Sequence, residues 1–401
     1  MNELLSRRVN AIQPSPTMGI TARAQALRRE GKDILSLSVG EPDFPVFPHV
    51  AKAIEEALRK GQTKYTPSAG TVELREAIAE RMLRDYGVKY GPQQIIATAG
   101  AKQALYNACQ VLLDDGDEAV VPNPGWVSYP EMARLGGCHV VELMLRAEDR
   151  WIGRADELAK VMSPRTKLVM LGSPSNPTGA VWPEQSLREI AAVLEKFPKA
   201  VIISDDIYDK LTYGGVVQAS LAKVAPQLIP RLLLVNGCSK AYAMTGLRLG
   251  WAAGPVEIIQ AMCKVQDAST SNPSSLSQAA AIAALKGPQE PLETMRLAFE
   301  RRRDLAVQLV NLIPGVHVEK PDGAYYLFCD VRGLLERTVR GLPVGTSHRL
   351  AELLLEEHGV ATVPGSAFGR EGYLRLSFAT SDEDLKKAIG RIAKAAEMLG
   401  R

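Results

Sequence analysis

Short apolar runs separated by helical patterns are the feature that most restricts how this chain can fold. Amphipathic patterns such as AKQALYNACQVLL and PEQSLREIAAVLEKF lie between several of the runs. This alternation is typical of an α/β domain built on a mostly parallel sheet flanked by helices. The runs that we interpret as buried strands are QIIATAG, EAVVPNP, HVVELML, KLVMLGSP, AVIISDD, RLLLVNG and RLGWAAGP.

The length of 401 residues suits one large domain with a smaller companion. We assign residues 46–288, which begin with the helical pattern VFPHVAKAIEEALRKG, to the large domain. A long amphipathic pattern starts near residue 289, so 289–401 is expected to hold a connecting helix and a small C-terminal domain with a βαβ-like order. Residues 17–45 are assigned to the small domain. Residues 1–16, irregular and marked by proline, are expected to form an arm that packs on another part of the assembly.

The charge and cysteine content exclude several classes of partner. A net charge of +3 without a basic tract or acidic tail gives no reason to expect nucleic acid or a membrane surface as partner. The five cysteines are odd in number and never form a CxxC pair, which argues against disulfides and zinc. The N-terminus lacks the apolar core of a signal peptide, and no window approaches the ~20 apolar residues of a membrane span. We therefore expect a soluble, cytoplasmic protein that acts on small molecules.

Polar residues that follow the apolar runs are the candidates for a functional site, because ligands of open α/β sheets bind beyond the carboxyl ends of the strands. Gly100 and Ala101 would expose backbone N–H groups at a helix N-terminus, which favours a phosphate, although small residues also start helices for packing reasons. Lys102 in the first turn opposes the helix dipole. Either an anion lies nearby, or Lys102 is a solvated surface lysine.

Asp205 ends a strongly apolar run, where an unpaired carboxylate is costly to bury unless it meets a cation. A protonated heteroaromatic nitrogen would serve as that cation. A capping or loop aspartate is the alternative, and Asp206 competes for the same role. Tyr208 is ambiguous by itself, since most tyrosines after strands simply pack.

Lys240 follows RLLLVNG and stands eight residues before Arg248. A lysine attacks an aldehyde only when it is deprotonated, and desolvation with a nearby cation lowers the pKa of its amine. Arg248 is such a cation and could also bind a phosphate with two hydrogen bonds. With Asp205 and the helix N-terminus, these residues describe a pocket for a phosphorylated, cationic aromatic aldehyde. Pyridoxal 5′-phosphate has that chemistry.

Nine ordered motifs resemble those of the fold-type-I pyridoxal-phosphate aminotransferases, and most closely the bacterial aspartate aminotransferase subgroup. The resemblance covers essentially the whole chain. It implies a large domain with a mostly parallel seven-stranded sheet flanked by helices, and a smaller α/β domain. The motifs are GEPDF at 40–44, KYTPSAG at 64–70, GAKQAL at 100–105, PGWVSYPEM at 124–132, SNPTG at 175–179, SDDIY at 204–208, SKAYAMTGLRLGW at 239–251, PDGAYY at 321–326 and LRLSFATS at 374–381.

The resemblance also implies roles for single residues. Lys240 would bond the cofactor and shuttle the proton, with Asp205 at the ring nitrogen and Tyr208 and Asn176 at the ring oxygen. Trp126 would stack on the ring, and Tyr129 stands where some relatives carry a histidine, which leaves the support of Asp205 open. The remaining implied contacts are Gly100, Ala101, Lys102, Ser239 and Arg248 around the cofactor, Tyr65 at the phosphate of a neighbouring subunit in a homodimer, and Arg375 and Gly40 with Asn176 at the substrate α-carboxylate.

The expected substrates are an amino acid and a 2-oxo acid, exchanged in a ping-pong mechanism. In the similar subgroup, Lys102 of GAK with Ser15 and Thr17 of PSPT would bind the distal carboxylate of a dicarboxylic substrate. This favours aspartate with 2-oxoglutarate, with prephenate or aromatic amino acids as alternatives. A β-lyase on the same fold would use the same residues. A non-enzymatic regulator is a further alternative that we do not favour, because it would normally carry a DNA-binding module ahead of the arm. No histidine lies in a motif, so metal chemistry is not indicated.

Overall fold

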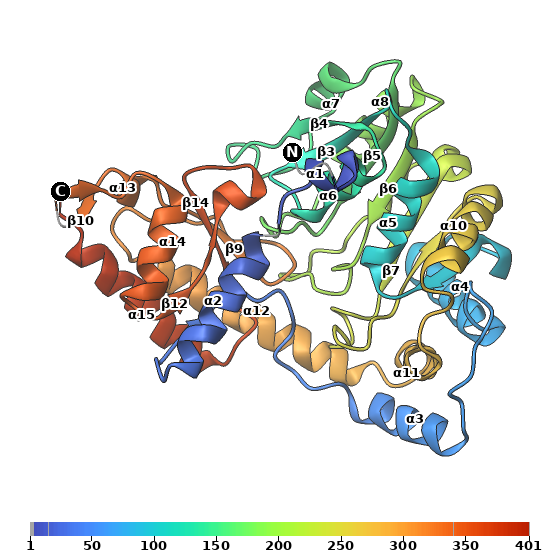
Figure 1. Ribbon diagram of the computed structural model, residues 1–401, viewed down its shortest axis with the longest axis horizontal. Coiled ribbons are helices and arrows are strands. Elements are labelled where there is room, and N and C mark those ends of the chain that lie inside the picture. Colours follow the sequence, from blue (N-terminus) through green and yellow to red (C-terminus); the bar gives the residue numbers. More distant parts are fainter. Residues whose placement is uncertain (1–3, 15, 340, 401) are drawn as a thin grey trace.

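A seven-stranded sheet forms the centre of the larger part of the molecule (Figure 1). The computed structural model describes residues 4–14, 16–339 and 341–400. The strand order is β2-β8-β7-β6-β5-β3-β4, and β8 is antiparallel to both neighbours while the other pairs are parallel. The strands are β2 (Ile95–Thr98), β3 (Glu118–Asn123), β4 (His139–Met144), β5 (Thr166–Gly172), β6 (Val201–Asp205), β7 (Leu232–Gly237) and β8 (Gly250–Ala253). All seven apolar runs thus form the predicted strands.

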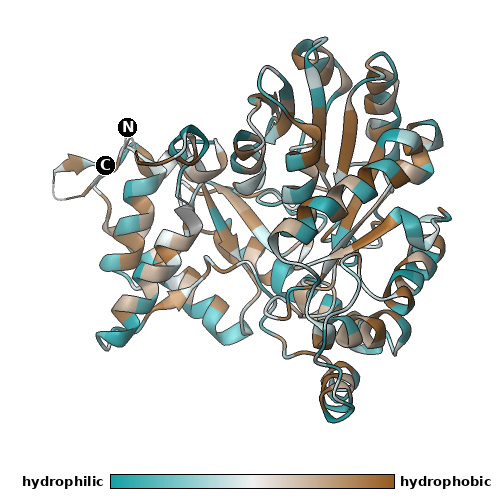
Figure 2. Cartoon of the chain, turned by 45° about the vertical axis from the view of Figure 1, so that its right-hand side comes forward, coloured by the Kyte–Doolittle hydropathy of each residue, from teal (hydrophilic) through white to brown (hydrophobic). Residues whose placement is uncertain are grey.

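Helices cover both faces of this sheet, which explains why the central strands are buried on both sides. Figure 2 shows brown, apolar strands in the middle and teal residues on the outward sides of the helices. One face packs against α5, α6 and α10, and the other packs against a larger core that includes α4, α8 and α11. The helices are α3 (Pro48–Arg59), α4 (Val72–Tyr86), α5 (Ala101–Leu112), α6 (Ser128–Leu135), α7 (Ala155–Val161), α8 (Glu184–Glu195), α9 (Leu221–Val224), α10 (Val256–Ser269) and α11 (Ser275–Lys286), with 3-10 turns η1 (Pro92–Gln94) and η2 (Pro226–Arg231).

The long helix α12 (Glu290–Val310) leads from the larger part into the smaller one, as the pattern after residue 289 predicts. The smaller part differs from the βαβ-like order expected for it. Its main sheet is antiparallel, with order β13-β14-β9, so the two strands that flank the helix Ser347–Glu356 in the chain, β9 and β13, each pair with β14 rather than with each other. Its elements are β9 (Tyr326–Asp330), α13 (Arg332–Leu335), β10 (Thr338–Val339), β11 (Leu342–Pro343), α14 (Ser347–Glu356), β12 (Val360–Ala361), β13 (Val363–Pro364), η3 (Gly365–Phe368), β14 (Tyr373–Ser377) and α15 (Asp382–Met398).

The N-terminal segment crosses between the two parts. Helix α2 (Pro16–Arg29) packs against β12 and β13, and β1 (Leu35–Ser36) pairs in parallel with β12, so this segment lies with the smaller part (Figure 1). The expected irregular arm contains a short helix, α1 (Arg7–Ala11), which packs near α6. At the start of α1, the hydroxyl of Ser6 accepts a hydrogen bond from the N–H of Val9. This cap stabilises a helix whose sequence has no apolar periodicity.

Candidate functional site

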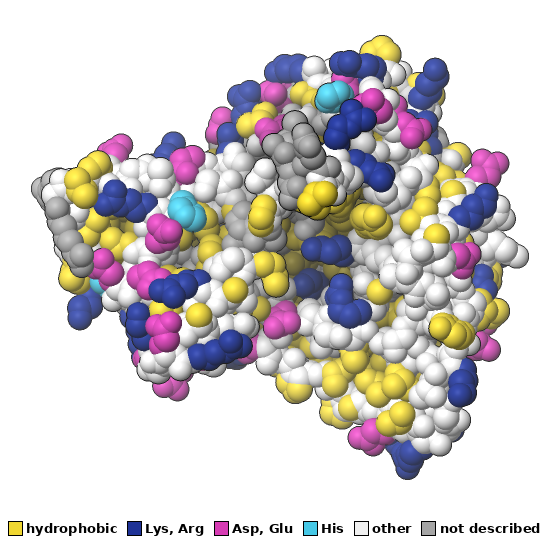
Figure 3. Space-filling view, in the orientation of Figure 1, with side chains coloured by type: hydrophobic (Ala, Val, Ile, Leu, Met, Phe, Trp, Pro, Cys, Tyr) yellow, Lys and Arg dark blue, Asp and Glu magenta, His cyan; other side chains and the backbone are white. Residues whose placement is uncertain are grey.

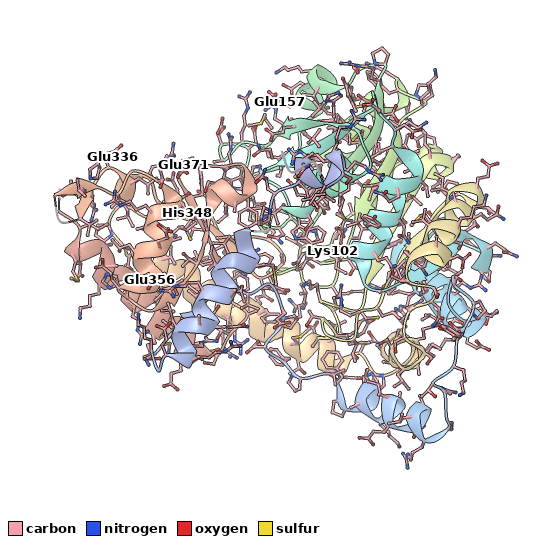
Figure 4. All side chains as sticks on the ribbon, viewed as in Figure 1. Lys102, Glu157, Glu336, His348, Glu356 and Glu371 are labelled. Carbon is pink, nitrogen blue, oxygen red and sulfur yellow. The ribbon has the colours of Figure 1, made fainter. Side chains whose placement is uncertain are left out.

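The candidate site is a cavity of about 480 Å³ at the carboxyl edge of the large sheet, where the two parts of the molecule meet. The loops after β2, β3, β5, β6 and β7 all reach it, as expected for an open α/β sheet. Figure 3 shows Lys and Arg side chains gathered in this central hollow, and Figure 4 places Lys102 there. The predicted site residues that line the cavity are Gly40, Ala101, Lys102, Trp126, Asn176, Asp205, Tyr208, Ser239, Lys240, Arg248 and Arg375.

Lys240 follows β7 and points its amine across the cavity. Its Nζ donates a hydrogen bond of 2.6 Å to the carbonyl oxygen of Gly40 and lies 5.9 Å from the centre of the Tyr208 ring. Burial is the main reason that the pKa of Lys240 is lowered to about 8. Arg248 is among the cations that also lower this pKa, whereas nearby carboxylates raise it. About a tenth of this amine is therefore unprotonated at pH 7, far more than for an ordinary lysine, and the unprotonated form is the nucleophile towards an aldehyde.

Asp205 is the last residue of β6 and is buried. Tyr129 donates its hydroxyl to Oδ2 of Asp205 at 2.8 Å, and the N–H of Ile207 donates to Oδ1 at 3.2 Å. Burial nevertheless raises the pKa of Asp205 to about 6, with these hydrogen bonds acting in the opposite direction. Tyr129 thus supplies the support for Asp205 that the sequence left open. A cationic ring nitrogen beside this carboxylate would offset its desolvation cost.

Asp206 does not share the position of its neighbour. Its Oδ1 accepts a hydrogen bond of 2.8 Å from the hydroxyl of Ser204, and Asp206 is not among the residues that line the cavity. Burial raises the pKa of Asp206 well above its ordinary value, because it disfavours the charged carboxylate. Of the two aspartates that the sequence left in competition, Asp205 is the one at the cavity.

The start of α5 forms an anion-binding corner. Gly100 precedes the helix with φ +82°, and a Cβ at this position would lie 2.6 Å from Nη2 of Arg248. Arg248 therefore packs directly against the helix N-terminus, where backbone N–H groups and the dipole favour a phosphate. Lys102 stands beside it with Nζ 4.9 Å from the centre of the Trp126 ring. Desolvation, followed by Arg248, lowers the pKa of Lys102 although the side chain stays exposed.

Arg375 on β14 brings the smaller part of the molecule into the site. Its Nη1 donates to Oδ1 of Asn176 at 3.0 Å, and its Nη2 donates to the carbonyl oxygen of Ser38 at 2.6 Å. The guanidinium lies 4.4 Å from the centre of the Tyr326 ring, and its Nε is buried without a partner among the described residues. A buried guanidinium with unused donor capacity suits a carboxylate ligand.

Aromatic side chains close the remaining sides of the cavity. Trp126 meets Tyr129 edge-on, with ring centres 5.4 Å apart. The hydroxyls of Tyr208 and Tyr326 share a hydrogen bond of 2.8 Å. Tyr326 is a site residue that sequence reasoning missed, although it ends the PDGAYY motif, because nothing in the sequence shows which distant tyrosine it pairs with.

Three predicted residues are not placed at this cavity by the described part of the chain. Tyr65 is 89% exposed and is not among the described residues that line the cavity. Ser15 lies outside the described residues, and so does the side chain of Thr17. Their nearest described neighbours at the cavity are Met18 and Thr21 on α2. Their roles remain predictions.

Comparisons with known proteins identify the family. The model of the family "Aminotransferase class I and II" matches residues 32–392. The chain belongs to this family. The aspartate aminotransferase of Geobacillus stearothermophilus is 43% identical over 98% of this chain and 99% of the relative. The aspartate/prephenate aminotransferase of Cereibacter sphaeroides is 43% identical over 97% of both chains.

Solved structures show the same relationship. The crystal structure of the aspartate aminotransferase from Rhizobium meliloti superimposes with a TM-score of 0.96 at 42% identity, over 99% of both chains. The Thermus thermophilus aspartate aminotransferase with maleate gives 0.91 at 42% identity, over 97% of this chain and 99% of that chain. The aminotransferase is thus a pyridoxal-phosphate-dependent transaminase of fold type I.

The residues of the site fit this cofactor. The corner made by Gly100, Ala101 and Arg248 would hold the phosphate, and Asp205 would pair with the ring nitrogen. Lys240 would bond the aldehyde carbon. When bound, the cofactor supplies an electron sink for bond breaking at the substrate α-carbon. In the described part of the chain, no three His, Cys, Asp or Glu residues are placed to bind a metal ion, and no helix combines the length and apolar character that crossing a membrane needs.

Proposed function

We propose that this aminotransferase moves an amino group between aspartate and 2-oxoglutarate by a ping-pong mechanism. Arg375 and Asn176 would bind the substrate α-carboxylate, since the guanidinium already faces the cavity with free donor capacity. Lys240 would remove the α-proton and return it, which its pKa of about 8 allows near neutral pH. Asp205 would keep the ring nitrogen protonated throughout.

Lys102 is the observation that carries the choice of a dicarboxylic substrate. It is a second cation, besides Arg248, at the corner of the cavity where α5 begins. A single phosphate does not require both groups, and the pKa of Lys102 is lowered by desolvation and by Arg248, so a further anion would relieve an unfavourable pair of like charges. The distal carboxylate of aspartate or glutamate would be that anion. Ser15 and Thr17 are proposed to assist it.

Steady-state kinetics of Lys102→Gln test this proposal. We expect kcat/KM for aspartate to fall by roughly 30-fold or more, in line with the loss of a charge-assisted contact, while kcat/KM for alanine stays within a small factor. Lys160→Gln serves as the matched control, because its exposed amine only pairs with Glu157 on α7. An unchanged kcat/KM for aspartate in Lys102→Gln would remove the dicarboxylate assignment.

Prephenate or aromatic amino acids are the second candidate substrates. The cavity also presents apolar and aromatic side chains, among them Met18 on α2, Trp126 and Tyr326. These surfaces could contact a ring while Lys102 binds a ring carboxylate. If both substrates use this site, prephenate should compete with aspartate at fixed 2-oxoglutarate. Absence of competition would show that prephenate does not bind there.

We further propose a homodimer with shared active sites. The ring of Tyr65 is almost fully exposed on the loop before α4, which suits a side chain that completes the phosphate site of a second copy. Residues 1–16 would pack on the partner as an arm, and residues 17–45 and 289–401 would act as one small domain against 46–288. We place the protein in the cytoplasm, where a reducing milieu suits its five free cysteines.

Hybrid dimers test the shared site. Tyr65→Phe and Lys240→Ala subunits, mixed and re-associated, would form hybrids in which one site has both native groups. We expect such hybrids to recover close to half of the wild-type activity per dimer, above either parent. If Tyr65 acts within its own subunit, no hybrid site is complete and the mixture shows no recovery.

A further inference from the structure

Residues Ser38–Glu41, which we call the strap, cross the cavity and contact both parts of the molecule. On the side of the smaller part, the carbonyl of Ser38 accepts from Arg375 Nη2 at 2.6 Å, and the carbonyl of Gly40 accepts from the hydroxyl of Tyr325 at 2.9 Å. The preceding residue, Leu37, is held there too by backbone hydrogen bonds to Ala361 and Ser377. The strap is therefore anchored firmly at its N-terminal end.

Only two side-chain hydrogen bonds join the strap to the loop that carries Lys240. One is the bond from Lys240 Nζ to the carbonyl of Gly40, and the other runs from the hydroxyl of Thr245 to Oε2 of Glu41 at 2.8 Å. Both Glu41 and Thr245 line the cavity. Glu41 raises the pKa of Lys240 by its charge, and its hydrogen bond with Thr245 is a separate contact.

Lys240 Nζ would bond the cofactor aldehyde, so its hydrogen bond to Gly40 would be lost when the cofactor is loaded. The bond between Thr245 and Glu41 would then remain as the one side-chain hydrogen bond between the strap and this loop. We propose that Glu41 and Thr245 form a latch that fixes the strap in the cofactor-loaded enzyme, and so positions Gly40 and the Ser38–Arg375 contact for the substrate carboxylate. Both residues are positioning residues. The inference rests on pyridoxal phosphate as the cofactor and does not depend on aspartate as substrate.

The geometry at Gly40 explains why position matters. A Cβ at this residue would lie 2.8 Å from the hydroxyl of Tyr326. The backbone of the strap therefore approaches Tyr326 at a distance that leaves no room for a side chain. A small outward movement of the strap would also withdraw the Ser38 carbonyl from Arg375. The guanidinium that receives the substrate would then lose the partner that orients it.

A latch and a simple charge effect predict opposite results. Glu41 is a negative charge beside a site for anionic substrates, so if charge alone mattered, its removal would lower KM. A latch instead predicts that KM rises in Thr245→Val, because this variant removes the hydrogen-bond donor and keeps the charge of Glu41. We expect the KM values of amino donor and 2-oxo acid to rise about fivefold with kcat within twofold, as for loss of one modest hydrogen bond.

Three variants and one exchange measurement complete the test. Thr245→Ser and Glu41→Gln keep the hydroxyl and an acceptor, and should leave KM near or below the wild-type value. Adding Glu41→Ala to Thr245→Val should cause no further rise in KM, since both remove one contact. Amide hydrogen exchange over residues 38–43 should be about fivefold faster in Thr245→Val than in wild type with cofactor bound, and equal without cofactor, because the Lys240 bond then holds the strap.

Equal exchange in the two cofactor-loaded proteins, or an unchanged KM in Thr245→Val, would overturn the latch. The exchange measurement needs no turnover. A failure of the aspartate proposal would therefore leave this result readable by itself.

Discussion

Tyr129 donates its hydroxyl to Oδ2 of Asp205 at 2.8 Å, and both residues are buried in the wall of the cavity. This hydrogen bond lowers the pKa of the Asp205 carboxyl and thus opposes the effect of burial. In Tyr129→Phe the pKa of Asp205 rises further, so the carboxylate needed beside the ring nitrogen persists only at higher pH. We expect the acid limb of the kcat/KM profile to move to higher pH by about one unit.

Tyr90→Phe is the matched control for that profile. The hydroxyl of Tyr90 is buried without a partner among the described residues, so its loss breaks no hydrogen bond seen there. The profile of Tyr90→Phe should coincide with that of wild type. An unshifted acid limb in Tyr129→Phe would show that Tyr129 does not act on Asp205.

The neighbouring aspartates give a second prediction. Asp205→Asn should lower kcat/KM by about 10²–10³-fold, because a preorganised charge at the reacting system is lost. Asp206→Asn should keep kcat/KM within a few-fold, because Asp206 lies outside the cavity lining. Parallel kinetics of the two variants, at equal cofactor content, check this. Equal losses would contradict the assignment of the ring partner.

The second prediction extends to the stability of the fold, through Asp206. Its folded-state pKa is raised by burial, so the unfolded chain releases this proton more readily and the folded state loses stability as the pH rises above about 4. Asp206→Asn removes this cost. Urea unfolding should show a gap in the free energy of unfolding, in favour of the variant, that widens as the pH rises above about 4. A constant gap would mean that Asp206 does not titrate on unfolding.

Most of the large domain could be predicted from the sequence for a clear reason. Strands such as β5 and β6 are buried on both faces, and such strands read as continuous apolar runs bounded by turn residues. The polar residues at their ends, Asn176 and Asp205, meet at one edge because parallel strands share a direction. Topology alone thus brings much of the site together.

The parts that escaped prediction depend on contacts between distant segments. The antiparallel pairing of β9 with β14 aligns Phe328 with Arg375, and neither strand's sequence indicates its partner's direction. Backbone acceptors such as the carbonyls of Ser38 and Gly40 have no sequence signature at all. Helix α1 was missed because RRVNA has too few apolar residues for a periodic pattern.

Lys240 gives a third prediction, on the cofactor-free protein. Its folded-state pKa is about 8 against an ordinary value of 10.5, so the unfolded chain holds its proton more tightly. The amine therefore destabilises the fold below about pH 8, and this cost disappears as the pH rises from 8 to 10.5. Lys240→Met should unfold at higher urea than wild type at pH 7, with a smaller difference at pH 10.

Lys52→Met provides the control for this measurement, because Lys52 is a surface residue of α3 with a side chain that is 73% exposed. Its replacement should leave the midpoint nearly unchanged at both values of pH. A lower midpoint for Lys240→Met at pH 7 would contradict the desolvation of this amine.

Arg375 gives a fourth prediction. Lysine cannot donate simultaneously from two planar nitrogens, so Arg375→Lys should lose the paired contacts to Asn176 and Ser38 and bind a carboxylate poorly. We expect kcat/KM for both the amino acid and the 2-oxo acid to fall by about 100-fold. Arg332→Lys, at an exposed position next to the same sheet, should change neither value measurably. A loss confined to one of the two substrates would contradict a shared carboxylate site.

The covalent role of Lys240 is the central claim, and borohydride reduction of the cofactor-loaded protein tests it most directly. Peptide mass spectrometry after reduction should find the pyridoxyl group on Lys240, whose amine is half-buried and has a pKa lowered to about 8. The cavity holds one other lysine among the described residues, Lys102, so the experiment has a built-in competitor. Label on Lys102, or on no lysine of the cavity, would contradict the account.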